Sequence, residues 1–310
     1  MPVRQRDLGR VLVIGAAGFL GAAVAKHLRA RGVQIVAADI AKRCDGLGEM
    51  ACCDVSEFSQ VEALVGEGHF ATILHCGGIS GPMVRTDDPL AIWRINALGS
   101  ANVLEAARRA GVARPVLCSA IDVYGSRHGG VADETMAPDP DTVYAASKVA
   151  AEEAVLGYRR EHGLDAIALR LAWIYGPGRR TPTELETLLR NAIAGRRTVL
   201  TGHPKDPSHY LFIDDAVQGL VRAAAAAETR SAIFNLTSGK TASLARAVEI
   251  VRAVLPELDV GFAQTEWTPK GPCGFSQALA EAELGFERQV QFPEGVRRYV
   301  EALRSPAETA

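Results

Sequence analysis

Short runs of apolar residues alternate along the chain with longer segments in which apolar residues recur at helical spacing. Residues 11–14 form a continuous apolar run, which is typical of a strand buried on both faces. Further strands are predicted at residues 34–39, 50–55, 71–76 and 116–119. Helical spacing is found at residues 19–28, 57–65, 88–110, 144–162, 183–194, 216–227 and 293–304. Strands that alternate with helices predict an α/β protein built on a parallel sheet.

The first strand ends in a turn that carries three glycines. Gly15, Gly18 and Gly21 lie between the first apolar run and the helix that follows it. In such a turn the first glycine permits a tight bend, the second lets the backbone approach a pyrophosphate, and the third lets helix and strand pack closely. Amides at the helix N-terminus favour a bound phosphate. Glycines also occur in turns that bind nothing, but the context here favours a Rossmann-like doubly wound parallel sheet that binds a dinucleotide.

An acid at the end of the second strand adds to this interpretation. Asp39 lies eighteen residues after Gly21, where dinucleotide-binding folds carry the carboxylate that binds the adenosine ribose hydroxyls. A solvated strand end is the alternative interpretation. Because a carboxylate repels a 2′-phosphate, Asp39 favours NAD over NADP, while the nearby cations Lys42 and Arg43 keep NADP open.

Polar or small residues also lie at the ends of the third and fourth strands, and one polar residue lies within a helix. Asp54 ends the third strand, where it either flanks the adenine together with Val55 or caps the next helix. Gly77 and Gly78 follow the fourth strand, and small residues at this end of a strand let a ligand approach the backbone. Asn96 lies in the middle of the longest early helix. It is either a solvated residue or a brace for the neighbouring loop.

Tyr144 and Lys148 open the helix predicted at residues 144–162. Residues four apart on a helix lie on one face. A phenol has an ordinary pKa of about 10, too high for a general base at neutral pH, and an ammonium group beside it favours the phenolate. Such a pair is common by chance, but behind a dinucleotide turn it indicates an acid–base site.

Composition and charge narrow the class of protein. A chain of 310 residues with 48% hydrophobic residues can form one large α/β unit with a smaller lobe. The net charge is −2 and there is no basic block, so nucleic acid and anionic membranes are unexpected partners. No apolar run reaches a membrane-spanning length and the first ten residues lack the apolar core of a secretion signal, so we expect a soluble, cytoplasmic protein. The six cysteines lack CxxC spacing, which argues against a metal site or a disulfide framework.

These motifs together resemble the extended short-chain dehydrogenase/reductase superfamily, and within it the NAD-dependent epimerase/dehydratase family. The resemblance covers nearly the whole chain and is carried by Asp39 and by residues 15–21, 54–55, 75–78, 95–108, 123–125, 144–148, 169–178 and 212–220. It implies an enzyme in which Tyr144 is the catalytic acid/base. Lys148 then holds the nicotinamide ribose and lowers the pKa of Tyr144, and a Ser or Thr hydroxyl binds the substrate oxygen.

The resemblance also implies which residues bind NAD and substrate. The expected cofactor-binding residues are Gly15, Gly18, Phe19, Leu20, Gly21, Asp39, Asp54, Val55, Cys76, Gly77, Gly78, Asn96, Tyr144, Lys148 and Ile174. The expected substrate contacts are Ser80, Ser119, Tyr144 and Arg179. Members of the family commonly form homodimers through a four-helix bundle made by the helices that correspond to residues 88–110 and 144–162.

The chain departs from the family pattern at the working hydroxyl. The family's loop usually carries this hydroxyl four residues before the tyrosine that corresponds to Tyr124, and here that position is Ala120. The loss of one hydrogen-bond donor to a developing oxyanion costs about 10²–10³ in rate. Either Ser119 or another donor replaces the hydroxyl, or turnover is slow.

A second departure concerns the substrate. Members that bind nucleotide sugars usually carry Asn two residues before the tyrosine of the YGP motif, and an Arg-Asp-Phe-like segment before the acidic pair at 214–215. Here these positions hold Trp173 and residues 208–210, Ser-His-Tyr, so nucleotide-sugar binding is weakened as an interpretation. The stretch Gly77–Ser80 is similar to uronate dehydrogenases, which oxidise free sugars.

Several charged residues near the C-terminal half have two interpretations. Arg179 and Arg180 either clamp a carboxylate or phosphate of the substrate or are a solvated pair after a turn. A lone histidine such as His209 is more often structural than catalytic. Asp214 and Asp215 are expected to cap the helix predicted at 216–227.

We therefore expect an NAD-binding domain at residues 1–175, to which residues 208–260 return, and a small C-terminal substrate-binding lobe made of residues 176–207 and 261–310. The first functional hypothesis is an NAD-dependent oxidoreductase acting on a carbohydrate-like or small hydroxylated substrate. The second is a sugar epimerase or dehydratase that recycles its NAD. The third is a sensor that binds NAD without turnover, which Ala120 favours and the Tyr144–Lys148 pair opposes.

Overall fold

A seven-stranded sheet lies at the centre of the molecule. The computed structural model describes residues 3–81, 84–127, 129–179, 181–239, 242–264, 266–268 and 271–305. All neighbouring strands of the sheet are parallel. In sheet order they are β14 (Ile233–Leu236), β9 (Ile167–Leu171), β7 (Arg114–Ala120), β6 (Thr72–His75), β1 (Val11–Ile14), β2 (Ile35–Asp39) and β5 (Ala51–Cys52). The strand order reverses between β1 and β6, so the predicted doubly wound, Rossmann-like sheet is confirmed.

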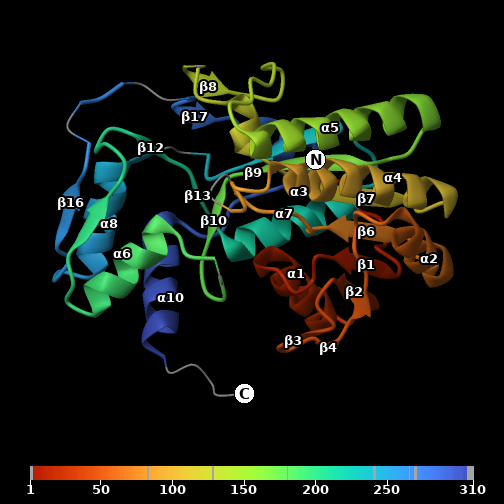
Figure 1. Cartoon of the computed structure of the whole chain (residues 1–310), viewed down its shortest axis with the longest axis horizontal. Coiled ribbons are helices and arrows are strands. Elements are labelled where there is room, and N and C mark those ends of the chain that lie inside the picture. The colour runs from red at the N-terminus through yellow and green to blue at the C-terminus, as the bar shows by residue number, and fades with distance from the viewer. Residues whose placement is uncertain are drawn as a thin grey trace.

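Helices cover both faces of this sheet (Figure 1). One face carries α1 (Phe19–Ala30) and α7 (Ile213–Ala225), and the other carries α2 (Phe58–Gly68), α4 (Gly99–Arg109) and α5 (Val143–His162). Alternate residues of β1 belong to different cores: Val11 and Val13 pack with Val24 of α1, whereas Leu12 and Ile14 pack with Val61 of α2. A strand buried on both faces needs a continuous apolar run, which is the pattern seen in the sequence.

The helix predicted at residues 88–110 is continuous but irregular. It consists of α3 (Pro89–Ile92), the π-helical segment η1 (Trp93–Leu98) and α4. A π-helical turn holds more residues than an α-helical turn and so changes the direction of the side chains beyond it. Asn96 lies in this segment and is only 1% exposed, so the interpretation of Asn96 as a solvated residue is wrong.

A smaller lobe lies beside the sheet, on the left of Figure 1. Its elements are α6 (Glu184–Ile193), β11 (Thr198–Leu200), β12 (Pro207–Ser208), β15 (Ala242–Ser243), α8 (Leu244–Val254), β16 (Val260–Phe262) and α10 (Phe292–Arg304). Strand β16 pairs with β11, β15 pairs with β12, and α8 contacts α10. Residues 242–260, which we assigned to the NAD-binding domain, therefore pack within the lobe, because these long-range pairings leave no trace in local sequence.

The remaining elements are short. They are β3 (Arg43–Cys44), β4 (Gly48–Glu49), the 3₁₀ turn η2 (Ile121–Tyr124), β8 (Val131–Ala132), β10 (Trp173–Tyr175), β13 (Tyr210–Phe212), β17 (Gly274–Phe275) and α9 (Ala278–Leu284). β10 pairs with β13, and β17 pairs with β8. Helix α9 contacts β14, so residues 278–284 lie against the sheet rather than in the lobe to which we assigned them. Within the described part of the chain, no helix is both long and apolar enough to cross a membrane.

Two predictions about helix caps are wrong. Helix α2 has Glu57 as its N-cap residue, and Asp54 instead accepts hydrogen bonds from the amide and hydroxyl of Ser56 at 2.9 and 2.8 Å. Helix α7 begins at Ile213, so Asp214 and Asp215 lie inside its first turn. Asp215 accepts from the amides of Gln289 and Val290 at 2.8 and 3.1 Å and thereby tethers the segment before α10.

Candidate active site

The glycine turn between β1 and α1 has the geometry that a dinucleotide needs. Gly15 has φ +80°, and a Cβ there would lie 2.3 Å from the amide nitrogen of Gly77 at the end of β6. A Cβ on Gly21 would lie 2.0 Å from the Gly15 carbonyl oxygen. Gly18 is the N-cap residue of α1 and no side chain caps this helix. Its first amides therefore suit a pyrophosphate, and the residues present fit NAD.

Asp39 is held at the edge of this turn. Its carboxylate accepts hydrogen bonds from the amide of Ala17 at 3.0 Å and from the amide of Ala41 at 3.1 Å. The two bonds fix the carboxylate against the glycine turn, so the interpretation of Asp39 as a freely solvated strand end is wrong. Asp39 pairs in the sheet with Cys52, and Asp54 follows two residues later on the same side of the turn.

The other residues expected around the cofactor lie along the same edge of the sheet. Phe19 and Leu20 begin α1 and are half-buried against the main core. Val55 is buried, and its carbonyl accepts from the Asn102 side chain at 2.8 Å. Cys76, Gly77 and Gly78 directly continue β6, and Ile174 lies in β10.

Asn96 braces the loop that follows β6, which was one of the two interpretations drawn from the sequence. Its side-chain oxygen accepts from the amide of Ile79 at 2.8 Å, and its side-chain nitrogen donates to the Ile79 carbonyl and to the Ser147 hydroxyl, both at 3.1 Å. Ser147 in turn donates to the carbonyl of Tyr144 at 2.7 Å. One buried amide thus ties loop 77–81 to the start of α5.

Tyr144 and Lys148 lie on the buried face of α5, whose N-cap residue Thr142 accepts from the amide of Ala145 at 3.1 Å. The Lys148 ammonium donates to the carbonyl of Cys118 at 3.0 Å and lies 5.8 Å from the centre of the Tyr144 ring. The two side chains that the sequence predicted to share a face therefore meet at the end of β7.

The pKa of Tyr144 is well above its ordinary value. Burial is the main cause, and the Asp122 carboxylate raises the pKa further, whereas a hydrogen bond from the amide of Gly81 and the charge of Arg179 lower it. Burial lowers the pKa of Lys148, and nearby acidic groups oppose that change. Gly81 and Asp122 were not among the residues expected from the sequence. Asp122 carried a signal, because it lies two residues after the end of β7, at the edge of the sheet where ligands bind.

The hydroxyl of Ser119 is bonded to helix α5. It donates to Glu152 Oε1 at 2.5 Å, and Glu152 forms a buried ion pair with Arg170 at 2.7 Å. Side chains alternate between the faces of a strand, so Ser119 and Ala120 lie on opposite faces of β7. The hydroxyl of Ser119 is therefore already used within the protein, and its substrate contact stays a prediction. Ala120 places no hydroxyl on the other face.

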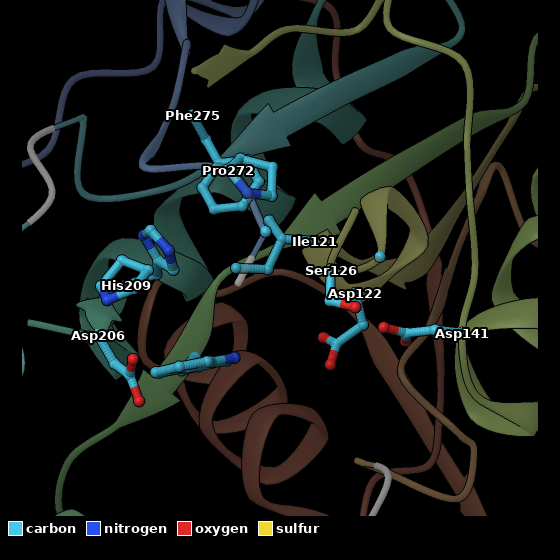
Figure 2. A pocket seen from close by; sticks show the side chains of 12 residues that line it. Ile121, Asp122, Ser126, Asp141, Asp206, His209, Pro272 and Phe275 are labelled. Carbon is cyan, nitrogen blue, oxygen red and sulfur yellow. The ribbon is translucent and has the colours of Figure 1, made fainter. Parts of the chain in front are cut away.

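A cavity of about 280 Å³ lies beside η2 and the β10–β13 pair. Its lining includes Asp122, Asp141, Trp173, Asp206, His209 and Phe275. Figure 2 shows the side chain of Asp141 extending toward Asp122. Burial raises the pKa of Asp122, and the charge of Asp141 adds to that increase. No lysine or arginine is among the described residues that line this cavity.

Two other cavity residues have distinct environments. Asp206 accepts from the amide of His203 at 2.8 Å through Oδ2, while its buried Oδ1 has no hydrogen-bond partner among the described residues. His209 is 6% exposed, and burial lowers its pKa to about 4, so the imidazole is neutral at pH 7. A hydrogen bond to the backbone of Pro272 holds the His209 ring, which fits the structural role expected of it.

Arg179 is used within the protein. Its guanidinium donates to the carbonyls of Ile174 at 2.7 Å and Thr181 at 3.2 Å, and it lies 5.7 Å from the centre of the Phe19 ring. These contacts contradict the interpretation of Arg179 as a solvated arginine. The contact with Phe19 also places its guanidinium beside the start of α1, which follows the glycine turn. Arg180 lies outside the described residues. Ser80 is exposed in the loop before Gly81.

No group of three or more His, Cys, Asp or Glu side chains that could hold a metal ion is found in the part of the chain that the structure describes.

Comparison with known proteins extends these observations. The model of the NAD-dependent epimerase/dehydratase family matches residues 11–237. A UDP-glucose 4-epimerase of Mycolicibacterium smegmatis is 29% identical over 313 residues, covering 96% of this chain and 100% of that protein. A dTDP-glucose 4,6-dehydratase of Streptomyces niveus is 26% identical, with coverage of 96% and 97%. The solved UDP-glucose 4-epimerase of Thermus thermophilus in complex with NAD superposes with a TM-score of 0.81 at 25% identity, with coverage of 96% and 99%.

Proposed function

The chain belongs to the NAD-dependent epimerase/dehydratase family of enzymes, and from this premise we propose that it oxidises a hydroxyl-bearing carbon of a neutral, sugar-like substrate with NAD. The observation that carries the proposal is the position of Tyr144 and Lys148. Both lie on the buried face of α5. Lys148 Nζ lies near Gly78 in the loop that follows β6, and Asp122, which lines the acidic cavity, raises the pKa of Tyr144. A sensor without turnover would have no need of this pair.

The glycine turn and Asp39 would hold the cofactor. The amides at the start of α1 face the pyrophosphate, and the carboxylate of Asp39 accepts hydrogen bonds from the adenosine ribose. NAD supplies the acceptor for the hydride that leaves the substrate carbon. The fixed negative charge of Asp39 beside the ribose supports NAD rather than NADP.

Tyr144 would take the proton from the substrate hydroxyl. Because burial raises its pKa, the phenolate needs nearby positive charge and hydrogen-bond donors. Lys148 lies within 5.8 Å of the ring and Gly81 donates from its amide, so both favour the ionised form. Lys148 is itself fixed by its bond to the Cys118 carbonyl, which keeps its ammonium group at the end of β7.

Asp122 would act where the family usually has a hydroxyl. It faces the cavity near Tyr144, whereas Ala120 has no polar group and Ser119 is bonded to Glu152. Burial and Asp141 both raise the pKa of Asp122 and thus favour its neutral carboxyl form. A neutral carboxyl can donate a hydrogen bond to the substrate oxygen as negative charge develops on it.

The cavity supports a neutral substrate over a nucleotide sugar. Asp141 and Asp206 repel a diphosphate, and Trp173, which is 46% exposed, offers an apolar face to a sugar ring. The unpartnered Oδ1 of Asp206 can accept a hydrogen bond from a sugar hydroxyl.

Epimerisation with recycled NAD is the second candidate, and the full-length similarity to a UDP-glucose 4-epimerase supports it. The two reactions differ in their net product. A dehydrogenase accumulates reduced nicotinamide with one turnover per substrate molecule, whereas an epimerase accumulates none.

The first test follows the absorbance of reduced nicotinamide. Purified protein is mixed with NAD⁺ or NADP⁺ and with free sugars, sugar acids, hydroxy acids or nucleotide sugars. We expect absorbance to rise with NAD⁺ and a free sugar. Isomerised nucleotide sugar without a net rise in absorbance would establish the epimerase instead.

Tyr144→Phe should lose nearly all turnover while NAD affinity stays close to that of the original protein, since only the acid/base hydroxyl is removed. Tyr158→Phe is the matched control, because Tyr158 lies on the same helix and its hydroxyl bonds only to Glu105 among the described contacts. Substantial turnover in the Tyr144 variant, measured at saturating NAD⁺, would contradict the assigned role.

A further inference from the structure

Two cysteines lie side by side at the carboxyl ends of β6 and β7. The parallel register pairs His75 of β6 with Leu117 of β7, so the next residues, Cys76 and Cys118, are neighbours across the two strands. Neighbouring strands lie about 4.8 Å apart. This spacing falls within the Cα separation of about 4.4–6.8 Å that a disulfide accepts.

The two thiols already contact each other. The Cys76 thiol donates a hydrogen bond to the Cys118 sulfur, and both side chains are only partly buried. This hydrogen bond raises the pKa of Cys76 and lowers that of Cys118, and the Lys148 ammonium also lowers the pKa of Cys118. Lowered pKa and partial exposure are the conditions that make a cysteine reactive toward oxidants.

The other four cysteines have no such arrangement. Cys44 and Cys53 are buried, Cys52 and Cys273 are exposed, and all four are free. Burial raises the pKa of Cys53 to about 11, which makes it unreactive. The chemistry proposed for Tyr144 and Lys148 uses neither the Cys76 thiol nor the Cys118 thiol.

We propose that Cys76 and Cys118 are a redox modification site, at which a peroxide forms a reversible disulfide that closes the NAD site. The Cys118 thiolate attacks one peroxide oxygen, the O–O bond breaks, and the released hydroxide takes a proton to become water. Cys76 then loses its thiol proton and attacks the sulfenic sulfur of Cys118, so that the S–S bond forms and the S–O bond breaks. The leaving hydroxide takes that proton and becomes the second water. Both sulfurs are oxidised and both peroxide oxygens are reduced. A dithiol reverses the reaction.

The disulfide would act on two parts of the site. Cys76 directly precedes Gly77, whose amide lies so close to Gly15 that even a Cβ on Gly15 would overlap it. A shift of Cys76 therefore moves the glycine turn. Cys118 supplies the carbonyl that holds the Lys148 ammonium, so a shift of Cys118 displaces Lys148. The expected loss of NAD binding rests on the proposed function, whereas the formation of the disulfide does not.

The experiment treats the protein with hydrogen peroxide and measures three quantities. Mass spectrometry of peptides identifies the linked cysteines, thiol titration counts those lost, and calorimetry measures NAD binding before oxidation, after oxidation and after dithiothreitol. We expect a peptide that links Cys76 to Cys118 and the loss of two thiols. NAD binding should vanish at concentrations that saturate the reduced protein and return with dithiothreitol.

Cysteine variants test whether these two residues cause the effect. For each variant, NAD binding is measured before and after treatment with peroxide. Cys118→Ser and Cys76→Ser should form no disulfide and show no dithiothreitol-reversible change in NAD binding. The variant Cys52→Ser/Cys273→Ser should respond as the original protein does. A reversible change that persists in Cys118→Ser, or oxidation that stops at a single cysteine without a linked peptide, would overturn the proposal. Absence of NAD binding in the reduced protein would overturn the proposed function and leave the linked peptide as the test of the disulfide.

Discussion

In the proposed reaction, Asp122 is the residue on which the rate depends most, because the neighbouring positions supply no hydroxyl to the substrate. Ala120 carries none, and the hydroxyl of Ser119 is bonded to Glu152 on the other face of β7. A carboxyl group differs from a hydroxyl in that it donates a hydrogen bond only while protonated. The activity of this site should therefore depend on pH in a way that a serine-containing site would not.

Replacement of Asp122 tests this idea. Asp122→Ala should lower kcat by about 10², the cost of one lost donor to a developing oxyanion. Asp122→Asn keeps a donor that does not titrate, so it should retain most of the activity and lose the fall in kcat that the original protein shows as pH rises through the raised pKa of Asp122. Steady-state kinetics from pH 5 to 9 gives both results. If Asn were as inactive as Ala, the ionised carboxylate would be the working form and Asp122 would be a base.

His75 should control stability in acid. It is 2% exposed, neither ring nitrogen has a hydrogen-bond partner among the described residues, and burial lowers its pKa to about 3. The unfolded chain binds a proton at this residue below pH 6.5 while the folded chain does not. As the pH falls from 6.5 to about 3, protonation of His75 in the unfolded chain therefore lowers the free energy of unfolding by about 1.4 kcal/mol per pH unit.

The variant His75→Phe lacks this titration. Urea unfolding at pH 7 and pH 5 should show a smaller loss of stability in acid for the variant than for the original protein, whatever their difference at pH 7. Equal losses would mean that His75 is protonated in the folded state. His162→Phe is a suitable control, because this residue lies exposed at the end of α5.

At the scale of elements, one buried ion pair joins a helix to two strands. Glu152 of α5 pairs with Arg170 of β9 and accepts from Ser119 of β7. The guanidinium of Arg170 also lies 4.7 Å from the centre of the Tyr124 ring, and the Tyr124 hydroxyl donates to Asn235 of β14 at 2.8 Å. The network sets the position of α5, and with it Tyr144 and Lys148, relative to the sheet.

Removal of one partner should be costly. Arg170→Met leaves the carboxylate of Glu152 buried without its partner, and we expect the free energy of unfolding to fall by about 3–5 kcal/mol. The double variant Arg170→Met/Glu152→Leu should recover much of this loss, because no unpaired charge remains. Arg246→Ala, which removes an exposed pair with Glu249, should change stability little. Denaturant titration measures all three, and a double variant no more stable than Arg170→Met would show that geometry rather than charge dominates.

The elements also show which predictions the sequence supports. The glycine turn was predictable because the needs of Gly15 and Gly21, a positive φ and a close approach, are local. The orientation of Ser119 was predictable in principle, since a period of two along β7 separates it from Ala120. The π-helical segment around Asn96, the pairing of β16 with β11 and the partner of Arg170 were not, because each depends on residues far away in the chain.

At the scale of the whole molecule, an apolar surface marks the expected interface of a homodimer. Leu90, Trp93, Leu98 and Val143 are large apolar residues that are 39–65% exposed, and they lie on α3, η1 and the start of α5. Figure 1 shows α3, α4 and α5 together in one layer at the top of the molecule. A four-helix bundle formed by two copies would cover this layer.

Charged substitution on this surface tests the dimer. We expect light scattering to give the mass of two chains for the original protein and of one chain for Leu98→Glu, since a buried charge at the interface has no partner. Val199→Glu is the control, because Val199 is 58% exposed on β11 in the small lobe. A monomeric original protein would remove the prediction.

The Asn96 side chain accepts a hydrogen bond from the amide of Ile79 and donates one to its carbonyl, and this pair of bonds limits the motion of loop 77–81. Loop 77–81 contributes the Gly81 amide that contacts Tyr144, yet the backbone of Ile79 is bonded to a helix rather than to water. The loop cannot open alone without leaving the buried amide of Asn96 unsatisfied. Loop, helix and the start of α5 therefore form one cooperative unit, in which local unfolding is all or none. A loop fixed in this way holds the Gly81 amide against Tyr144 before any substrate arrives.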